Sequence, residues 1–317
     1  MRAPGPSPSA LALGIAAVAL ALAGCGEDFV PFNRLVSLRV LAIQSEPVAP
    51  LTGEMAALTP LVYTPPGAEA VSYQWSWCPF PGGANDGYPC LVSEQEVREL
   101  AGAAADSIPP FDLGREPTAL FDNSIEPDLL ELLCEGTTQV PSLVSCQGGF
   151  PVQLRLTVRA GDQEVVTVRT LRLRFDPDSE PNQNPAIDGL AALVGDREVE
   201  LEDEPAVELP RGEETTIRAR VDDAAAEPYT DSDDAGNPIA ARERLIFTWF
   251  IESGDTSSER TVFIDDAVPL ADASEVEWEP AREDDFPGEV SAFILVLRDD
   301  REGVSWRQVS AGLEDSP

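Results

Sequence analysis

The sequence predicts a mostly β protein made of two tandem β-sandwiches. Apolar and polar residues alternate with a period of two in several short segments, and proline and glycine turns separate these segments. Residues 176–185 are polar and proline-rich, so no strand is expected to cross them. We therefore predict a first sandwich over residues 34–175, a linker over 176–185, a second sandwich over 186–313 and a short tail over 314–317.

The alternating segments of the first half define its expected strands. Residues 36–42 and 152–158 alternate, and their expected buried faces carry Val36, Leu38, Val40, Ala42, Val152, Leu154, Leu156 and Val158. Residues 166–175 also alternate, but the phase slips near Thr170. That slip predicts a β-bulge or a tight bend.

The second half contains two further expected strands. Residues 215–221 alternate, with one face formed by Thr215, Ile217, Ala219 and Val221. Residues 245–251 are apolar on both faces, as expected of a central strand in a sandwich.

The two halves also resemble each other. Tyr73-Gln74-Trp75 matches Phe247-Thr248-Trp249, and Phe150-Pro151 matches Phe286-Pro287 before a pair of strands. The spacing between these landmarks is much longer in the first half, and the excess lies between Cys78 and Cys146. We therefore predict an insertion over about residues 78–146 of the first sandwich.

This insertion carries two local helix signals. Ser93 and Glu96 have the spacing of a capping box. Glu126-Pro127-Asp128 places a proline in the first turn of a second short helix that extends to Leu133. The insertion is therefore predicted to be partly helical.

A resemblance to a known domain family comes from four segments of the second half. They are the aromatic-x-Trp segment at Trp249, Val276-x-Trp278-x-Pro280, Pro287-Gly288, and Leu297 to Val304. Together they resemble immunoglobulin-like domains of the PKD kind, over roughly residues 186–313 and more faintly 34–175. The family's Gly-Asp-Gly turn is replaced by Glu252-Ser253-Gly254-Asp255. The resemblance implies a spacer, adhesion or carbohydrate-contact role.

The N-terminus carries an export signal. Residues 1–24 contain a short apolar run that ends in Leu22-Ala23-Gly24-Cys25, which resembles the lipobox of bacterial lipoproteins. The resemblance implies lipidation of Cys25, a tether over residues 25–33 and anchoring in the cell envelope. Gly26 after the cysteine favours the outer membrane. The alternative is an ordinary secretory signal in which Cys25 is incidental.

Four cysteines remain beyond the lipobox: Cys78, Cys90, Cys134 and Cys146. An even number in an exported chain predicts two disulfides. The pairing Cys78–Cys90 and Cys134–Cys146 is favoured, because each bond closes a short loop rich in turn residues. A four-thiolate zinc site is the alternative, although neither pair has the close spacing of a zinc knuckle.

The composition excludes several functions. The net charge of −36 repels nucleic acid and anionic lipid surfaces, so no nucleic-acid partner is expected. The chain has no histidine and no lysine. Catalytic triads, histidine-containing zinc sites, Schiff-base chemistry and the phosphate-loop lysine are therefore all excluded. A glycoside hydrolase that uses two carboxylates is still possible, but no motif indicates one.

Acidic loops suggest calcium. Asp231-Ser232-Asp233-Asp234-Ala235-Gly236 resembles part of an EF-hand, but Ala235 replaces a ligand and Arg242 stands where glutamate is needed. In the linker, Asp176 and Asp178 lie beside further oxygen ligands. The alternative at both places is a solvated acidic loop. The candidate calcium ligands are Asp176, Asp178, Asp231, Asp233 and Asp234.

These observations predict a lipid-anchored envelope protein with a non-catalytic binding, scaffolding or spacer role. Its partners would be the membrane, through the N-terminal lipid, and an envelope protein or polysaccharide. The alternatives are a calcium-stabilised surface adhesion module and a carboxylate-based hydrolase.

Overall fold

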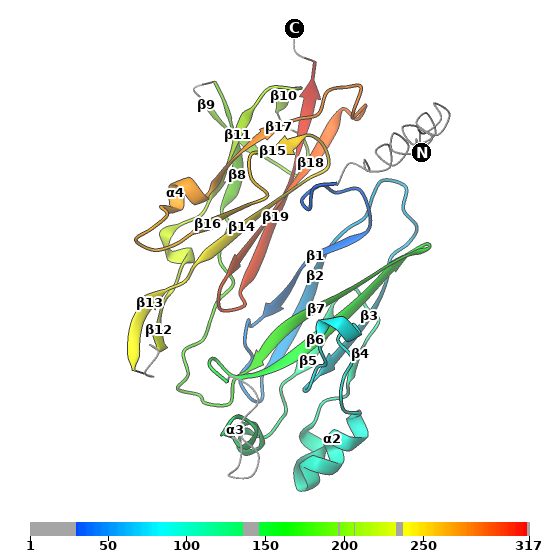
Figure 1. The fold of residues 1–317 in the computed structure, drawn as a ribbon, viewed down its shortest axis with the longest axis vertical. Helices are drawn as coiled ribbons and strands as arrows, with labels where there is room; N and C mark the ends of the chain where they lie inside the picture. The colour runs from blue at the N-terminus through cyan, green and yellow to red at the C-terminus, as the bar shows by residue number, and fades with distance from the viewer. Residues whose placement is uncertain (1–29, 136–145, 196, 206, 233–236, 316–317) are drawn as a thin grey trace, which may run out of the picture. The chain divides into compact units, whose positions relative to one another are not determined.

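The computed structural model describes residues 30–135, 146–195, 197–205, 207–232 and 237–315. Their strands form two successive β-sandwiches (Figure 1). Both belong to the same unit of the chain, Asn33–Pro317. As predicted, no strand crosses residues 176–185.

The first sandwich contains two antiparallel sheets. One has the order β1-β2-β5, formed by β1 (Arg39–Glu46), β2 (Met55–Tyr63) and β5 (Ala119–Asp122). The other has the order β4-β3-β6-β7, formed by β4 (Asp112–Gly114), β3 (Ser72–Cys78), β6 (Phe150–Ala160) and β7 (Gln163–Leu173).

The second sandwich repeats this plan. One sheet has the order β15-β17-β11-β8-β9, formed by β15 (Asp255–Thr256), β17 (Glu275–Glu279), β11 (Thr215–Arg220), β8 (Gly189–Val194) and β9 (Arg197–Leu201). The other has the order β10-β19-β18-β14-β16, formed by β10 (Glu208–Pro210), β19 (Val304–Glu314), β18 (Val290–Asp299), β14 (Leu245–Ile251) and β16 (Arg260–Phe263). A separate hairpin consists of β12 (Pro228–Ser232) and β13 (Pro238–Arg242).

The strand order is that of immunoglobulin domains, with strands A, B and E in one sheet and C, F and G in the other. In that lettering the first sandwich uses β1, β2, β5 and β3, β6, β7. The second uses β8, β11, β17 and β14, β18, β19. In both, the segment after strand A pairs in parallel with strand G or its end, through Leu51 and Arg174 in the first and through β10 and β19 in the second. The protein therefore consists of tandem immunoglobulin-like β-sandwiches, as predicted.

Each sandwich has its own core around buried tryptophans. Trp75 and Trp77 on β3 belong to the first core, and Trp249 on β14 and Trp278 on β17 to the second. All four are at most 2% exposed. The indole N–H of Trp75 donates to the Glu116 carbonyl oxygen and that of Trp249 to Thr261 Oγ1. Each bond lies in the connection between strands C and E, so the tryptophan fixes that connection to the core.

Several predicted strand faces are confirmed and one is wrong. The inward residues of β6, from Val152 to Val158, are at most 2% exposed. In β1 the pairing register shifts between Val40 and Ala42, so the prediction of one uninterrupted face over residues 36–42 fails. Leu41 and Ala42 both contact the second sandwich, whereas Leu38 and Val40 pack in the first core. Val36 precedes the strand and is 56% exposed.

The bulge predicted near Thr170 is also absent. Strand β7 pairs with β6 without a register shift from Gln163 to Leu173. The phase slip in the sequence has another cause: Thr167 and Arg169 occupy inward positions opposite Leu156 and Leu154, while Val166 is 41% exposed on the outer face. A polar residue on the inner face thus imitates a bulge in the sequence pattern.

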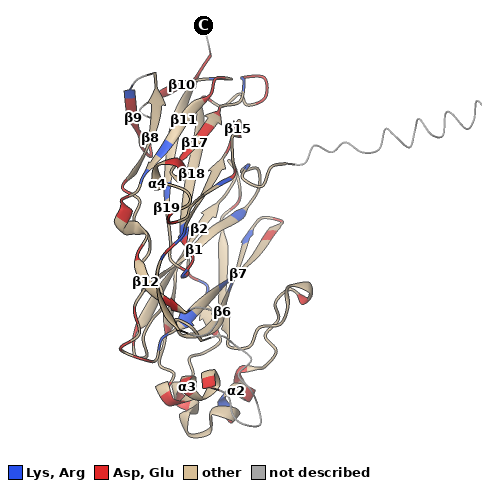
Figure 2. Ribbon diagram, turned by 60° about the vertical axis from the view of Figure 1, so that its left-hand side comes forward, with Lys and Arg blue, Asp and Glu red and all other residues tan. Residues whose placement is uncertain are grey.

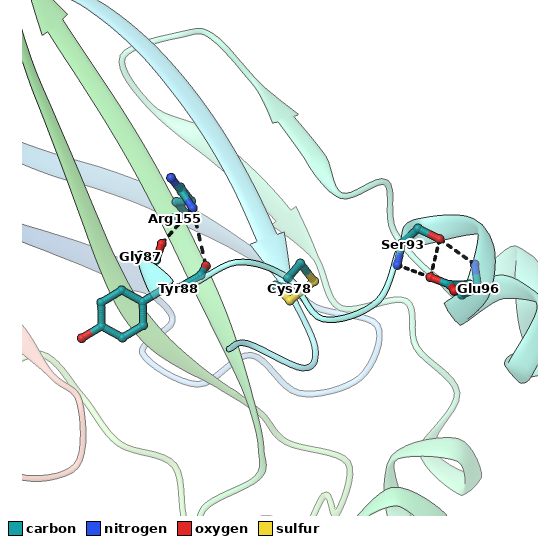
Figure 3. The surroundings of a disulfide bond; sticks show 7 residues. Cys78, Gly87, Tyr88, Ser93, Glu96 and Arg155 are labelled. Atoms are coloured by element: carbon teal, nitrogen blue, oxygen red, sulfur yellow. Dashed lines mark hydrogen bonds between the residues drawn. A yellow bond between two sulfur atoms is a disulfide. The ribbon is translucent and has the colours of Figure 1, made fainter. Parts of the chain in front are cut away.

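The inserted region of the first sandwich holds both disulfides in the predicted pairing, Cys78–Cys90 and Cys134–Cys146. Figure 3 shows the first, at the end of β3. Nearby, Arg155 on the adjacent β6 donates to the carbonyl oxygens of Gly87 at 3.2 Å and Tyr88 at 3.5 Å. The inserted loop is therefore fixed to the sheet by a covalent bond and by an arginine.

Both predicted helices of the insertion are present. α2 (Glu94–Ala101) starts with the capping box of Ser93 and Glu96, and α3 (Pro127–Glu135) has its proline in the first turn. Strand β5 lies between them and carries the fully buried Phe121. The insertion thus lengthens the two connections on either side of strand E. The remaining helical turns are η1 (Ala84–Asp86), η2 (Gly102–Ser107), η3 (Asp223–Ala225) and α4 (Leu270–Ala273).

The match of Phe150-Pro151 with Phe286-Pro287 is not structural. Phe150 starts β6, whereas Phe286 lies in the loop before β18. The strand pairings give the equivalence instead: Trp75 lies opposite Leu156, and Trp249 opposite Leu295.

Candidate functional site

The two sandwiches meet at an apolar contact, which we call the junction. It joins the outer face of β1 and β2 to the outer face of β14, β18 and β19. The first sandwich contributes Leu35, Leu41, Ala42, Leu61 and Tyr63, and the second contributes Phe250, Ile294, Val296 and Val304. All of these residues are at most 9% exposed. Because a buried side chain of this size stabilises by about 1.5–3 kcal/mol, the junction is expected to hold the sandwiches together.

Hydrogen bonds fix the register of the junction. Gln44 on β1 donates to the Val304 carbonyl oxygen at 2.9 Å. Asn184 of the predicted linker donates to the Ser45 carbonyl oxygen at 3.0 Å and accepts from the Val304 backbone N–H at 2.9 Å. Tyr63 donates to Glu252 Oε1 at 3.0 Å, and burial beside that carboxylate raises the pKa of the Tyr63 hydroxyl. Asn184, a residue of the predicted linker, therefore bonds to both sandwiches.

Two arginines line a cavity of about 320 Å³ beside the apolar contact. Arg169 on β7 donates to the carbonyl oxygens of Ile43 and Glu302, and Arg298 on β18 donates to the carbonyl oxygen of Leu41. Burial lowers the pKa of each guanidinium to about 10. Each arginine thus reaches from one sandwich to the backbone of the other.

A second hollow, of about 370 Å³, is the candidate site, and we call it the arginine cleft. Four arginines line it: Arg172, Arg174, Arg244 and Arg301. Its other polar side chains come from Gln147, Ser179, Glu180, Asn182, Tyr229, Thr230, Asp231 and Asp300. These residues belong to both sandwiches and to the predicted linker, so the cleft exists only where the sandwiches meet. Its volume lies within the range of small-molecule sites, about 300–1,000 Å³.

Arg244 is held on one side of the cleft by a single carboxylate. Asp300 Oδ2 accepts from Arg244 Nε at 2.9 Å, and Oδ1 accepts from the Arg244 backbone N–H at 3.3 Å. The Arg244 side chain is nevertheless 58% exposed. Asp300 raises the pKa of Arg244, so the guanidinium stays charged.

Arg301 is set more deeply. Its guanidinium lies 4.9 Å from the centre of the Tyr229 ring and donates to Glu243 Oε1 at 3.3 Å. The Glu243 carboxyl is fully buried, and it also accepts from the Glu227 backbone N–H at 3.0 Å. Burial, with Asp299 nearby, raises the pKa of Glu243 to about 7. These contacts hold the Arg301 side chain in place, so it forms a rigid part of the cleft lining.

Two more contacts shape the cleft. Arg174 donates to Ser179 Oγ at 2.9 Å, which orders the first turn after β7. Gln147 donates to Asp231 Oδ1 at 2.7 Å and so connects the first sandwich to the β12–β13 hairpin. Backbone and Gln147 hydrogen bonds lower the pKa of Asp231.

The charge of the cleft contrasts with that of the protein. Acidic residues are spread over both sandwiches (Figure 2), and the net charge is −36. The lining of the arginine cleft instead holds four arginines against Glu180, Asp231 and Asp300, a balance of +1. The acidic surface repels anionic ligands, so an anion is expected to bind best in the arginine cleft.

A larger hollow of about 880 Å³ lies at β10 and the start of β18, and its chemistry is different. Glu208, Glu283, Glu289 and Asp315 line it together with Arg211. Arg211 donates to the carbonyl oxygens of Ala281, Phe286 and Gly288, so its role is to hold that loop. This hollow has no comparable cluster of arginines.

Of the predicted calcium ligands, Asp176, Asp178 and Asp231 lie within the described residues. Asp176 accepts from the Asp178 backbone N–H at 2.9 Å, which is a local turn, and Asp231 is engaged by Gln147 and the Ser232 backbone N–H. Asp233 and Asp234 lie outside the described residues, as does Cys25. No group of three or more acidic or cysteine side chains able to hold a metal ion occurs among the described residues.

The arginines of the cleft were not predicted as site residues. Arg172 and Arg174 look like the solvent face of an alternating strand, and Arg244 like the flank of a buried one. A signal was present, since Arg169, Arg172 and Arg174 lie within one segment of a strongly acidic chain. Their grouping with Arg244 and Arg301 depends on the packing of the sandwiches.

Comparisons with known proteins give structural neighbours alone. No protein-family model and no curated protein sequence matches the chain. The three N-terminal domains of the bacteriophage RB49 outer capsid protein Hoc align at a TM-score of 0.22 and 9% identity, over 89% of this chain and 100% of that one. The Yersinia pseudotuberculosis adhesin InvE aligns at 0.17 and 10%, over 85% and 58%. The four N-terminal immunoglobulin domains of Dscam1 align at 0.18 and 10%, over 89% and 52%. At these scores the neighbours carry no argument about function.

One further finding concerns the membrane. Within the described residues, no helix has the length and apolar character needed to span a bilayer.

Proposed function

We propose that this protein is a non-catalytic binding protein of the cell envelope, anchored by lipid on Cys25, with the arginine cleft as its ligand site. The observation that carries the proposal is that the cleft is built from both sandwiches and the segment between them. Binding sites are found preferentially at such domain interfaces. The apolar junction beside it favours a preorganised site, which lowers the entropic cost of binding.

The anchor is tested by metabolic labelling with radioactive palmitate. The wild-type chain should be labelled and should sediment with membranes, in the outer-membrane fraction of a density gradient. The Cys25→Ser variant should be unlabelled and released into the soluble fraction. Labelling of the variant, or its retention in the membrane, would exclude lipidation at this residue.

The binding role is tested by a thermal-shift screen of the mature chain, residues 25–317. The panel should contain neutral sugars, sugar acids, small organic acids, phosphates and short peptides at matched ionic strength. A ligand that binds only the folded state raises Tm in a saturable way. The shift should be lost in Tyr229→Ala with Arg244→Gln and kept in Arg307→Gln, an exposed arginine outside the cleft. Shifts that survive in the double variant would place binding elsewhere.

The two alternative functions receive no support from a specific contact. Asp176 and Asp231, two of the candidate calcium carboxylates, accept from neighbouring backbone N–H groups. The arginine cleft contains three carboxylates: Asp300 is bonded to Arg244, Asp231 to Gln147 and Glu180 to the Thr230 backbone N–H. Neither arrangement supplies the pair of opposed free carboxyls that glycoside hydrolysis needs.

A further inference from the structure

Part of the positive charge of the chain is gathered where the two sandwiches meet. Arginine is the only basic residue type, and there are 21 arginines in the sequence. Six of these line the two hollows at the junction, two in the 320 Å³ cavity and four in the arginine cleft. Each arginine of the cavity donates to a backbone carbonyl group of the opposite sandwich, Arg169 to Glu302 and Arg298 to Leu41, which is a structural use. In the cleft, Arg174 and Arg301 also donate to protein groups, whereas the Arg244 side chain is 58% exposed.

Arg244 is the arginine of the cleft whose N–H donors are best placed to face a ligand. A guanidinium has five N–H donors in a planar fork that matches a carboxylate. Among the described residues, Asp300 is the only hydrogen-bond partner of the Arg244 side chain, and it takes the Nε–H. Asp300 also accepts a hydrogen bond from the Arg244 backbone N–H. The same carboxylate therefore fixes the orientation of the Arg244 guanidinium. The two terminal nitrogens of this exposed side chain are then placed to bind an oxyanion.

The charges that line the cleft determine the charge that a ligand should carry. The lining balance of +1 favours a single negative charge. Inorganic phosphate and phosphate esters carry about −1.5 to −2 at neutral pH and would meet Glu180, Asp231 and Asp300. Polyanions are disfavoured further by the net charge of −36. A monovalent carboxylate fits this balance best.

The uncharged side chains of the cleft indicate the chemistry of the rest of the ligand. Beside the arginines the cleft presents the hydroxyl of Thr230, the amides of Gln147 and Asn182, and the phenol of Tyr229. These are donors and acceptors for hydroxyl groups, while purely apolar side chains are scarce in the lining. The volume of about 370 Å³ is near the lower limit for small-molecule sites, so the ligand is small.

From these observations we propose that the arginine cleft binds a monoanionic, carboxylate-bearing sugar of the uronic-acid class, with Arg244 as its carboxylate-binding residue. This inference rests on the proposed function, because it names the ligand class of the same site.

Isothermal titration of the mature chain tests the inference. The probes are D-glucuronate and D-galacturonate, with D-glucose as the uncharged match and inorganic phosphate as the competing anion, all at equal ionic strength. At least one of the sugar acids should bind saturably with a Kd of about 1 mM or tighter. Glucose and phosphate should bind at least about tenfold more weakly, because a charge-assisted bidentate bond is lost or mismatched.

Variants locate the site. Arg244→Gln should weaken sugar-acid binding at least about tenfold, and Arg307→Gln should leave it unchanged. Circular dichroism checks that each variant is folded. Equal binding of glucose and glucuronate would overturn the inference, as would tighter binding of phosphate or no binding of either sugar acid. In those cases the thermal-shift screen still decides the proposed function separately, since a cleft-dependent ligand of another class would uphold it.

Discussion

The two sandwiches share their strand order but differ at one inward position of strand G. Trp75 and Trp249 are equivalent on strand C, and their cross-strand partners on strand F are Leu156 and Leu295. One pair further along, Leu154 lies opposite Arg169, whereas Phe293 lies opposite Val309. Val309 is fully buried in the second core. Arg169, in the same place, reaches out to Ile43 and to Glu302 of the second sandwich.

This difference shows how a residue of the first sandwich contributes to the contact with the second sandwich. A buried guanidinium is costly unless its N–H groups are bonded, and here carbonyl oxygens from both sandwiches bond them. The first sandwich therefore has an arginine where the second has an apolar core residue, and a carbonyl oxygen of the second sandwich completes the hydrogen bonds of that arginine. The second sandwich keeps an apolar core at this position and contributes an apolar outer face.

The largest expected effect comes from placing the arginine in the wrong sandwich. Val309→Arg buries a cation against Phe293 without a partner, and we expect the free energy of unfolding to fall by about 3–5 kcal/mol or more. Urea unfolding measures it. The reciprocal change Arg169→Val should cost far less, because a valine suits an inward strand position. Equal losses in the two variants would show that the two positions are not equivalent.

The junction itself is tested by Phe250→Ala. Phe250 is 2% exposed and lies in the apolar contact between the sandwiches. Its loss should reduce the free energy of unfolding by about 3–5 kcal/mol. It should also split a single calorimetric transition into two, one for each sandwich. Val290→Ala, at a 42% exposed site, is the control and should change little. A single transition in Phe250→Ala would mean that other contacts are enough to couple the sandwiches.

The inserted loops of the first sandwich depend on disulfides, whereas the equivalent connection of the second contains β15, β16 and α4. Replacing Cys78 and Cys90 together by alanine opens a loop whose ends are separated by 12 residues. We expect the free energy of unfolding to fall by about 3 kcal/mol, with the larger loss of local stability in the first sandwich. Hydrogen exchange resolves the location, since β3 and β6 should lose more protection than β14 and β18. Equal loss in both sandwiches would contradict this expectation.

The last prediction concerns the dependence of stability on pH. Glu243 has a folded pKa of about 7 against an ordinary value of 4.5, mainly because it is buried. The folded state therefore holds a proton that the unfolded state releases between these values. Its contribution to stability is fully present below pH 4.5 and is lost as the pH rises to about 7.

Glu243→Gln isolates this contribution. The Tm of the wild type should fall by a few degrees relative to the variant as the pH rises from 4.5 to 7.5. Parallel curves for the two chains would show that Glu243 does not titrate in this window. Glu277→Gln, on the outer face of β17, is a suitable carboxyl control.

The sequence was informative wherever local rules decide the structure. Alternation predicted the buried face of β6, the capping box predicted α2, and loop length predicted the disulfide pairing. The alternation pattern failed at β1 and β7, because each of these strands contacts the second sandwich. Leu41 is an apolar residue that packs in the junction. Arg169 is a polar residue at an inward position, and it donates a hydrogen bond to the second sandwich. The arginine cleft depends on this pairing of the sandwiches, so the local pattern did not reveal it.

The first described residues of the Asn33–Pro317 unit have a mechanical consequence. Before the chain enters β1, Arg34 forms a parallel bridge with Ile251, and Leu35 donates to the Ile251 carbonyl oxygen at 2.8 Å. Arg34 also makes an ion pair with Asp255 at 3.0 Å. A pull applied from the N-terminal side would therefore load the second sandwich and the junction before it reached the first strand. The hydrogen bonds of a short parallel segment would share that load in shear, so the molecule should resist tension as one body.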